Sequence, residues 1–216
     1  MNDLIRRMDM WLKMANSRQP EASRRQMIIG AAIILILGVG ASNGYGQDMY
    51  PTEVLKKRDA TLQELVASMD TAEGDAKIRQ AIVGSFDFER HSRISLGKYW
   101  KERSKVEQEE FTGIMRDWTE NRAIKKLMKR SDITTYDSEE LLGSKALVKT
   151  TVRYKGTRTL VDYKMQITDG QWVIYDMVVD GASVALANRD AFYKKIKKTS
   201  YEELVSILKA KTLETD

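Results

Sequence analysis

The residue types that support common enzyme chemistry are few in this chain of 216 residues. Cysteine is absent, which excludes thiol nucleophiles, disulfides and most structural zinc sites. The single histidine, His91, stands in the polar stretch Glu89–Arg93, and we interpret it as a solvated side chain. One histidine also excludes histidine-based metal clusters.

Carboxylates offer one further candidate for proton chemistry. Asp176 stands in the middle of an apolar run, and a carboxylate there needs hydrogen-bond partners or a raised pKa. We interpret it as an aspartate that fastens a sheet to a helix, with a general base as the alternative. Glu109-Glu110 and Glu139-Glu140 are adjacent pairs, so their side chains point apart. With no phosphate-binding or nucleophile motif in the required context, the chain is predicted not to be an enzyme and to need no cofactor or metal.

The net charge of +5 is concentrated near the N-terminus. Residues 1–41 contain six basic and three acidic side chains, so the rest of the chain has a net charge of only about +2. A nucleic-acid-binding protein needs a concentrated basic face. We therefore expect no nucleic-acid partner.

An export segment is predicted at residues 1–46. The run Met27–Ala41 is apolar and uncharged, short for a membrane span but typical of the core of a signal peptide. Arg24 and Arg25 precede it, as in the twin-arginine export motif. We expect a periplasmic protein, with residues 47–216 as its folded domain. If cleavage fails, the segment becomes an anchor in the inner membrane.

The folded part is predicted to be α+β. Pro51 is suited to the first turn of a helix, Asp75 is expected to cap a second, and Ser104 with Glu107 has capping-box spacing. A third helical segment spans 85–100 between the last two. Further along, alternation of apolar and polar residues predicts strands at 148–154, 161–167 and 171–179, with a hairpin at Asp169-Gly170, then helices at 183–197 and 200–211.

The chain is rich in apolar bulk, with eleven methionines, four tryptophans and nine tyrosines. Methionine-rich cores adapt to a flexible guest, although a methionine stripe is usually ordinary packing. Composition therefore leaves a lipid-binding cavity and a packed core both open.

Three stretches resemble the MlaC / toluene-tolerance family of periplasmic phospholipid-binding proteins, an auxiliary component of ABC-type lipid transport. They are 86–88 with 96–100, then 108–111, and then the longest, 172–192 with Leu204. In the last stretch Trp172, Tyr175, Asp176, Gly181 and Ser183 follow the family's W-x-x-Y-D…G-x-S pattern. Two departures, at Glu120-Asn121-Arg122 and at Asn188, are expected on helix surfaces, where they affect partner contacts.

The resemblance implies an NTF2-like, MlaC-like domain. In it, N-terminal helices, a curved antiparallel sheet of about four strands and C-terminal helices wrap an apolar cavity. It also implies a monomeric carrier that holds a phospholipid by its acyl chains. The carrier would shuttle lipid between an outer-membrane lipoprotein complex and an inner-membrane ABC transporter complex. Candidate cavity residues are Phe86, Leu96, Tyr99, Phe111, Met115, Trp118, Val148, Val152, Val161, Tyr163, Met165, Ile174 and Val178.

Two other functions remain open. One is a periplasmic adaptor or binding module of the same fold with a packed core and no lipid. The other is a small hydrolase or isomerase, which would need a buried polar dyad near Asp176.

Overall fold

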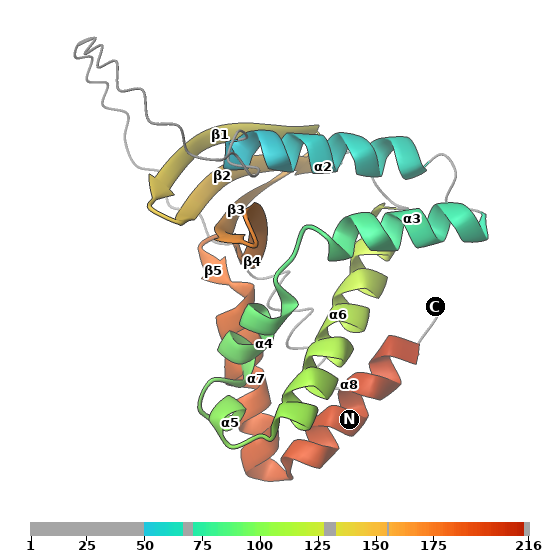
Figure 1. Ribbon diagram of the computed structural model, residues 1–216, viewed down its shortest axis with the longest axis vertical. Coiled ribbons are helices and arrows are strands. Elements are labelled where there is room, and N and C mark those ends of the chain that lie inside the picture. Colours follow the sequence, from blue (N-terminus) through green and yellow to red (C-terminus); the bar gives the residue numbers. More distant parts are fainter. Residues whose placement is uncertain (1–49, 67–70, 128–132, 155, 214–216) are drawn as a thin grey trace. The chain divides into compact units, whose positions relative to one another are not determined.

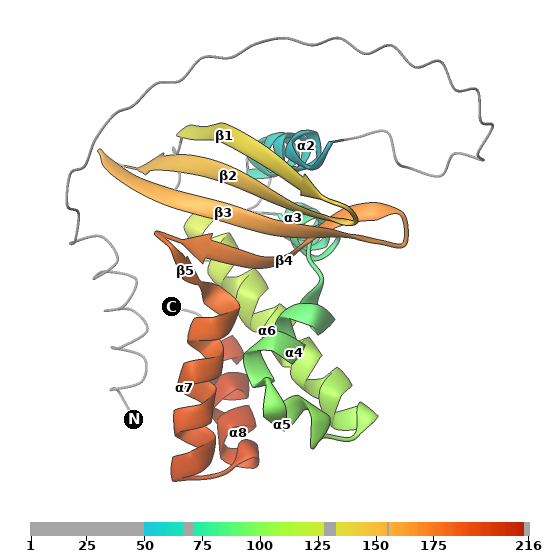
Figure 2. The ribbon, with the colours of Figure 1, turned by 90° about the vertical axis from the view of Figure 1, so that its left-hand side faces the viewer.

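The computed structural model describes residues 50–66, 71–127, 133–154 and 156–213 (Figures 1 and 2). These residues belong to one compact unit, Asp48–Asp216. The export segment expected at 1–46 lies outside the described residues, so that division of the chain stays a prediction.

The order of elements is helices, then strands, then helices, as the sequence predicts (Figure 1). The α+β class is confirmed, but the sheet has five strands where about four were expected. The helices are α2 (Pro51–Val66), α3 (Ala72–Val83), α4 (Phe88–Leu96), α5 (Lys98–Lys101), α6 (Lys105–Leu127), α7 (Val184–Lys198) and α8 (Tyr201–Leu213). The strands are β1 (Ile133–Leu142), β2 (Lys145–Tyr154), β3 (Thr157–Thr168), β4 (Gln171–Val179) and β5 (Ala182–Ser183).

The sheet is an open antiparallel meander in the order β1-β2-β3-β4-β5. Asp169 and Gly170 connect β3 to β4 with φ of 50° and 78°. Positive φ at both central residues is what a type I′ hairpin turn requires, so the predicted hairpin is confirmed. Asp180 and Gly181 repeat the pattern, with φ of 46° and 83°, between β4 and β5.

The starts of α2 and α3 test two capping predictions. Pro51 is the first residue of α2, as predicted. The cap predicted for α3 is wrong, because Thr71 caps it: the Thr71 hydroxyl accepts a hydrogen bond from the Gly74 amide at 3.0 Å. Asp75 lies one turn inside the helix, where its carboxylate accepts a bond of 2.7 Å from Arg79 Nε.

Gly97 divides the predicted third helical segment into α4 and α5. Its φ of 52° is a left-handed conformation that side chains disfavour. A Cβ at this position would meet the hydroxyl oxygen of Tyr193 and would lie 3.0 Å from Cδ of Arg189. Gly97 therefore ends α4, and its lack of a side chain allows α7 to pack against the boundary between α4 and α5.

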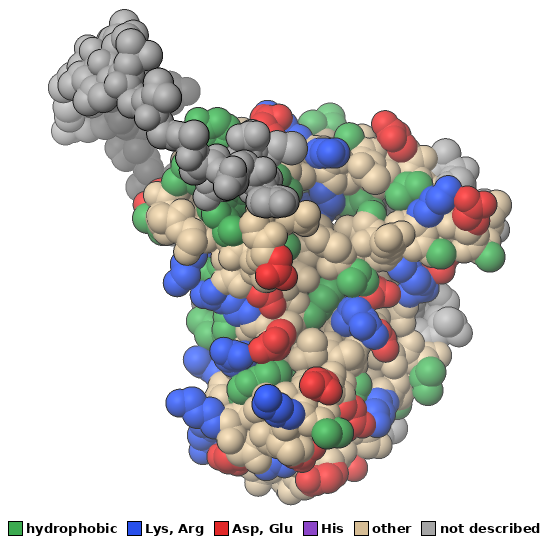
Figure 3. Space-filling view, viewed as in Figure 1, with side chains coloured by type: hydrophobic (Ala, Val, Ile, Leu, Met, Phe, Trp, Pro, Cys, Tyr) green, Lys and Arg blue, Asp and Glu red, His purple; other side chains and the backbone are tan. Residues whose placement is uncertain are grey.

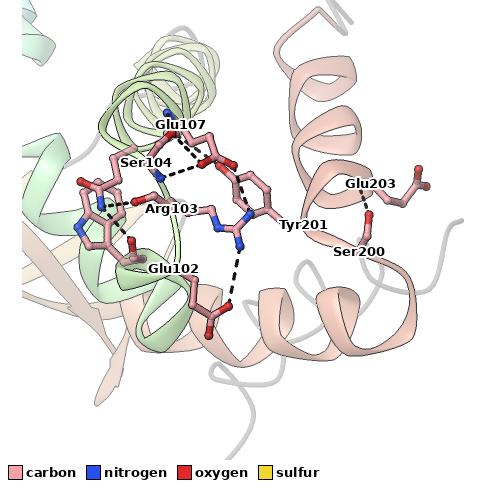
Figure 4. A network of polar contacts seen from close by, with 9 residues as sticks. Glu102, Arg103, Ser104, Glu107, Ser200, Tyr201 and Glu203 are labelled. Carbon is pink, nitrogen blue, oxygen red and sulfur yellow. Dashed lines mark hydrogen bonds and ion pairs between the residues drawn. The ribbon is translucent and has the colours of Figure 1, made fainter.

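A polar network joins the start of α6 to α8 (Figure 4). The predicted capping box is confirmed, since the Ser104 amide donates to Glu107 Oε2 at 2.8 Å and the Glu107 amide donates to Ser104 Oγ at 3.3 Å. Arg103 pairs with Glu107 at 3.3 Å, and its guanidinium lies 4.6 Å from the ring centre of Tyr201. Burial raises the pKa of the Tyr201 hydroxyl to about 12. The network fixes α8 against the N-terminal end of α6.

Three separate apolar clusters form the interior. The helical cluster comprises Leu96, Trp100, Phe111, Ile114, Met115, Phe192, Tyr201, Leu204, Val205 and Leu208, with partly buried Trp118, Ala191 and Ile196. The sheet cluster comprises Leu55, Ala146, Val148, Tyr163, Met165 and Ile174, with partly buried Val54, Phe86, Tyr136, Val161, Trp172 and Met177. The third cluster, between α2, α3 and α6, comprises Leu62, Ile78, Ile82 and Ile124, with partly buried Leu65, Ala81 and Ala123.

Candidate functional site

The sheet cluster covers one face of the three central strands. Val148 lies opposite Tyr163, Tyr163 lies opposite Met177, and Met165 lies opposite Ile174. Residues directly opposite in an antiparallel pair point to the same face. These five side chains therefore form a continuous apolar surface across β2, β3 and β4.

Segments from the N-terminal half complete this surface. Leu55 of α2 is fully buried against it. A short backbone bridge pairs Phe86 with Ile174 of β4. In this bridge the Asp87 amide donates to the Ile174 carbonyl at 2.7 Å, and the Ile174 amide donates to the Ser85 carbonyl at 2.9 Å. The apolar face is thus flanked by α2 and by the segment that leads into α4.

The sheet cluster is less completely covered than the helical cluster. Six of its twelve side chains are only partly buried, against three of thirteen in the helical cluster. Apolar surface left partly open to solvent costs about 25 cal/mol per Å² relative to full burial. The inner face of the sheet is therefore the part of the described chain best suited to an apolar guest.

Most strand candidates from the sequence meet on this face. Val148, Tyr163, Met165 and Ile174 are members of the sheet cluster, and Val161 packs against it. Val152 alternates onto the same face and is buried, opposite Thr134 and Thr159, but it lies outside the cluster.

The inward position predicted for Val178 is wrong. An irregularity between Lys164 and Met165 gives β4 one extra residue, Tyr175, relative to β3. The extra residue reverses the alternation, because strand side chains change face at every position. Met177 consequently shares the face of Ile174, and Val178 lies opposite Asp162 on the other side.

The helix candidates do not join the strand candidates, with one exception. Phe86 packs on the sheet cluster, whereas Leu96, Phe111 and Met115 are buried in the helical cluster and Trp118 packs against that cluster. Tyr99 belongs to neither and meets Tyr193 edge to face, with ring centres 5.0 Å apart. A helical pattern shows which side chains share one face of a helix but not which neighbour covers that face.

The sequence did not indicate six further members of the sheet cluster: Leu55, Val54, Ala146, Tyr136, Trp172 and Met177. Only Trp172 and Met177 lie in a motif that resembles the family.

Arg58 and Asp59 of α2 form a polar group with Tyr136 of β1 beside the sheet cluster. Asp59 Oδ2 accepts a hydrogen bond of 2.6 Å from the Tyr136 hydroxyl, and Asp59 Oδ1 accepts from Arg58 at 2.6 and 3.0 Å. The Arg58 guanidinium also lies 5.0 Å from the ring centre of Tyr163. Burial opposes the charge of Arg58, but Tyr163 and Asp59 together raise its pKa above the ordinary value. These contacts fix α2 to β1 and β3, and the charges of Arg58 and Asp59 neutralise each other.

His91 is buried, so the solvated position predicted for it is wrong. Only 3% of the side chain is exposed, because this side of α4 packs against α7 and β4. Its Nδ1 lies 3.1 Å from the Tyr175 carbonyl oxygen, and its Nε2 lies 3.5 Å from Nδ2 of Asn188. One carbonyl acceptor and one amide donor suit the neutral ring, and burial lowers the pKa of His91.

Asp176 fastens the sheet to α7, as predicted. The carboxylate is 1% exposed and accepts hydrogen bonds from the Ser183 hydroxyl at 2.7 Å and the Ala185 amide at 3.0 Å. Lys164 Nζ lies 3.3 Å away. All three partners are donors: Ser183 and Ala185 lie at the start of α7, and Lys164 lies in β3. The contacts of the carboxylate are therefore those of a structural anchor.

At the two departures from the family pattern, Glu120 and Asn188 are buried, not on helix surfaces as expected, whereas Asn121 and Arg122 are partly buried. Glu120 is 7% exposed and lies between Arg79 and Arg116, each at 3.6 Å. Burial raises the pKa of Glu120. Asn188 is 3% exposed and faces His91. Glu120 and Asn188 therefore affect internal helix packing.

Two features are absent from the described part of the chain. No group of three or more metal-ligating side chains lies close enough there to hold a metal ion. None of the helices described is long and apolar enough to cross a membrane.

The chain is similar to a known protein family and to solved structures. The family model described as MlaC protein matches residues 54–210. A phospholipid-binding protein from Ralstonia solanacearum, solved in complex with a phospholipid, has a similar fold with a TM-score of 0.64 and 18% identity. The similarity covers 78% of this chain and 97% of that one. No curated protein matches the sequence.

Proposed function

Because the chain belongs to the MlaC family, we propose that it is a carrier that binds a phospholipid by its acyl chains. The observation that carries this proposal is the partly covered apolar face of the sheet. The solved structure of similar fold is that of a phospholipid-binding protein in complex with a phospholipid, which supports the same ligand class.

We assign the acyl chains to the sheet cluster and not to the helical cluster. Val148, Val161, Tyr163, Met165 and Ile174 would contact the chains, with Met177 in place of Val178. The helical cluster has closed aromatic packing, such as the Phe111–Phe192 contact with ring centres 5.9 Å apart. Leu96, Phe111, Met115 and Trp118 therefore act as core in this proposal.

Acyl chains exposed to water carry a large free-energy cost. Each methylene transferred from water to an apolar environment contributes about 0.8 kcal/mol, so two acyl chains in water cost on the order of 20 kcal/mol. A carrier that covers the chains with an apolar sheet face removes most of this cost. The wider assignment extends to a periplasmic shuttle between an outer-membrane complex and an inner-membrane transporter complex. Family membership and the apolar segment 27–41 support it.

The test is lipid analysis of purified residues 48–216 by native mass spectrometry and solvent extraction. The expected result is about one diacyl phospholipid per protein. Val161→Trp fills the partly buried sheet cluster and should reduce bound lipid strongly. Ile196→Trp introduces the same side chain beside the helical cluster, and this variant should retain the lipid.

Two outcomes would contradict the assignment. Wild-type protein without lipid, and without uptake from added liposomes, would favour an adaptor with a packed core. Equal lipid loss in both tryptophan variants, with circular dichroism and thermal unfolding unchanged, would show that the sheet cluster is not the specific site. Export is tested separately by cell fractionation and N-terminal sequencing of the mature chain.

A further inference from the structure

A basic, aromatic face lies where α5 begins beside α7. Tyr193 of α7 accepts a hydrogen bond of 2.7 Å from the Lys98 amide and stacks edge to face on Tyr99. Lys98 Nζ lies 4.9 Å and 5.8 Å from the ring centres of Tyr99 and Tyr193. Arg189 adjoins them, since its Cδ lies against Gly97. Two half-buried tyrosines are thus bordered by cations from both helices.

The next turns of α7 extend this face. Residues three or four apart share one side of a helix, which aligns Arg189, Tyr193 and Lys197 in one row. Lys194 and Lys198 form the neighbouring row and are exposed. Blue side chains gather along this edge of the molecule, at the left of Figure 3, over the region that Figure 1 assigns to α4, α5 and α7.

The charge of this face is largely unneutralised. Arg189 lies 3.8 Å from Asp190. None of the four lysines, at 98, 194, 197 and 198, forms an ion pair with a carboxylate of the described residues, whereas Lys195 on the neighbouring side pairs with Glu203 at 3.4 Å. We define the basic face as Lys98, Tyr99, Arg189, Tyr193, Lys194, Lys197 and Lys198.

We propose that the basic face docks the protein on an anionic phospholipid surface. Clustered lysines are attracted to anionic head groups, and tyrosine rings favour the boundary between water and acyl chains. Lysine is a flexible point charge suited to a mobile layer of head groups, whereas a fixed protein carboxylate is better matched by the planar fork of arginine. The preponderance of lysine over arginine thus favours a membrane over an acidic protein.

Docking of this kind is independent of lipid carriage. The basic face lies on α5 and α7, and none of its residues belongs to the sheet cluster. A protein that carries lipid and one that does not are both able to use it. The two proposals are therefore tested by different variants.

The experiment is co-sedimentation of residues 48–216 with vesicles, either phosphatidylglycerol mixed with phosphatidylcholine or phosphatidylcholine alone. The test variant is Lys98→Gln/Lys194→Gln/Lys197→Gln. The control is Lys57→Gln/Lys77→Gln/Lys145→Gln, which removes the same charge from exposed lysines elsewhere. Each lysine near an anionic surface accounts for about a fivefold change in partitioning, so the test variant should bind on the order of 100-fold more weakly.

The expected pattern is binding of wild type and control to the anionic vesicles only, weakened by salt, and loss of binding in the test variant. Similar weakening in both triple variants would overturn the proposal, since it would reflect net charge alone. Absence of wild-type binding would also overturn it and leave an acidic protein as the partner. Binding that survives in the test variant but disappears in Val161→Trp would indicate lipid uptake and not docking.

Discussion

Acidification from pH 7.5 to 5.5 should destabilise the folded protein through His91. The ring is 3% exposed, and its two nitrogens face a carbonyl oxygen and an amide nitrogen, which suits the neutral form. Burial lowers its pKa in the folded state below the ordinary value of 6.5, although the Tyr175 carbonyl and the nearby Asp176 act in the opposite direction. The unfolded chain therefore binds a proton more readily than the folded one.

The sign and the size follow from proton linkage. Stability from this group is fully present above pH 6.5 and is lost as the pH falls below that value, because only the unfolded state gains the proton. If the folded ring stays neutral throughout, the loss between pH 7.5 and 5.5 reaches about 1.4 kcal/mol, and the limiting slope is about 1.36 kcal/mol per pH unit. Protonation of the folded ring within this range would reduce both figures.

The assay is urea unfolding at several pH values, followed by tryptophan fluorescence, for wild type and for His91→Gln. Glutamine retains a polar side chain but does not titrate, so carboxylate contributions common to both proteins cancel in the difference. We expect the wild type to lose up to about 1.4 kcal/mol more than the variant over this range. Because His91 is the only histidine, its ring proton resonances give its titration directly in an untagged protein.

Equal pH slopes for the two proteins would refute this reasoning. So would a ring titration in the folded protein at or above pH 6.5, since it would mean that the buried imidazole accepts a proton as easily as a solvated one. Either result would mean that the Tyr175 carbonyl and Asp176 offset the effect of burial, or that water reaches His91.

Substitutions at three further positions test the contacts that hold the fold. Asp176→Ala should cost roughly 3 kcal/mol in urea unfolding, because it strips the Ala185 amide of its acceptor, and Asp176→Asn should cost less because one acceptor oxygen remains. Gly97→Ala should lower stability by about 1 kcal/mol or more, measured as a reduced thermal midpoint, since it combines positive φ with a contact to Tyr193. Tyr136→Phe should cost about 1–2 kcal/mol in chemical unfolding, since a charged acceptor loses its 2.6 Å bond.

Local signals predicted most elements of the fold. Pro51, the Ser104–Glu107 capping box and the Asp169-Gly170 turn each act through a few neighbouring residues, and all three behave as expected. β1 escaped prediction because its sequence, ITTYDSEELL, alternates poorly and its side chains are mostly exposed. A strand at the edge of a sheet needs little apolar patterning, so the period-two signal is weak there.

The errors at His91 and at the start of α3 have different physical origins. His91 lies in a strongly polar stretch of sequence, yet it is buried because α7 packs against that side of α4. Thr71 competes with Asp75 as a cap, and both have suitable side chains, so the choice depends on where α3 begins. For His91 the residue type was informative, but the neighbour that decided its environment comes from a distant part of the chain. For α3 the choice lies between two capping residues only four positions apart.

The bulge in β4 shows how one residue alters a candidate site. Alternation places Ile174 and Val178 on one face only if every residue of β4 has a partner in β3, and the extra residue at Tyr175 breaks that condition. The same irregularity directs Asp176 toward Ser183 at the start of α7 while Met177 turns toward the sheet cluster. One bulge thus separates the side chain that anchors α7 from the apolar face. In our proposal, the part of the sheet that binds the acyl chains therefore differs from the part that holds the helices in place.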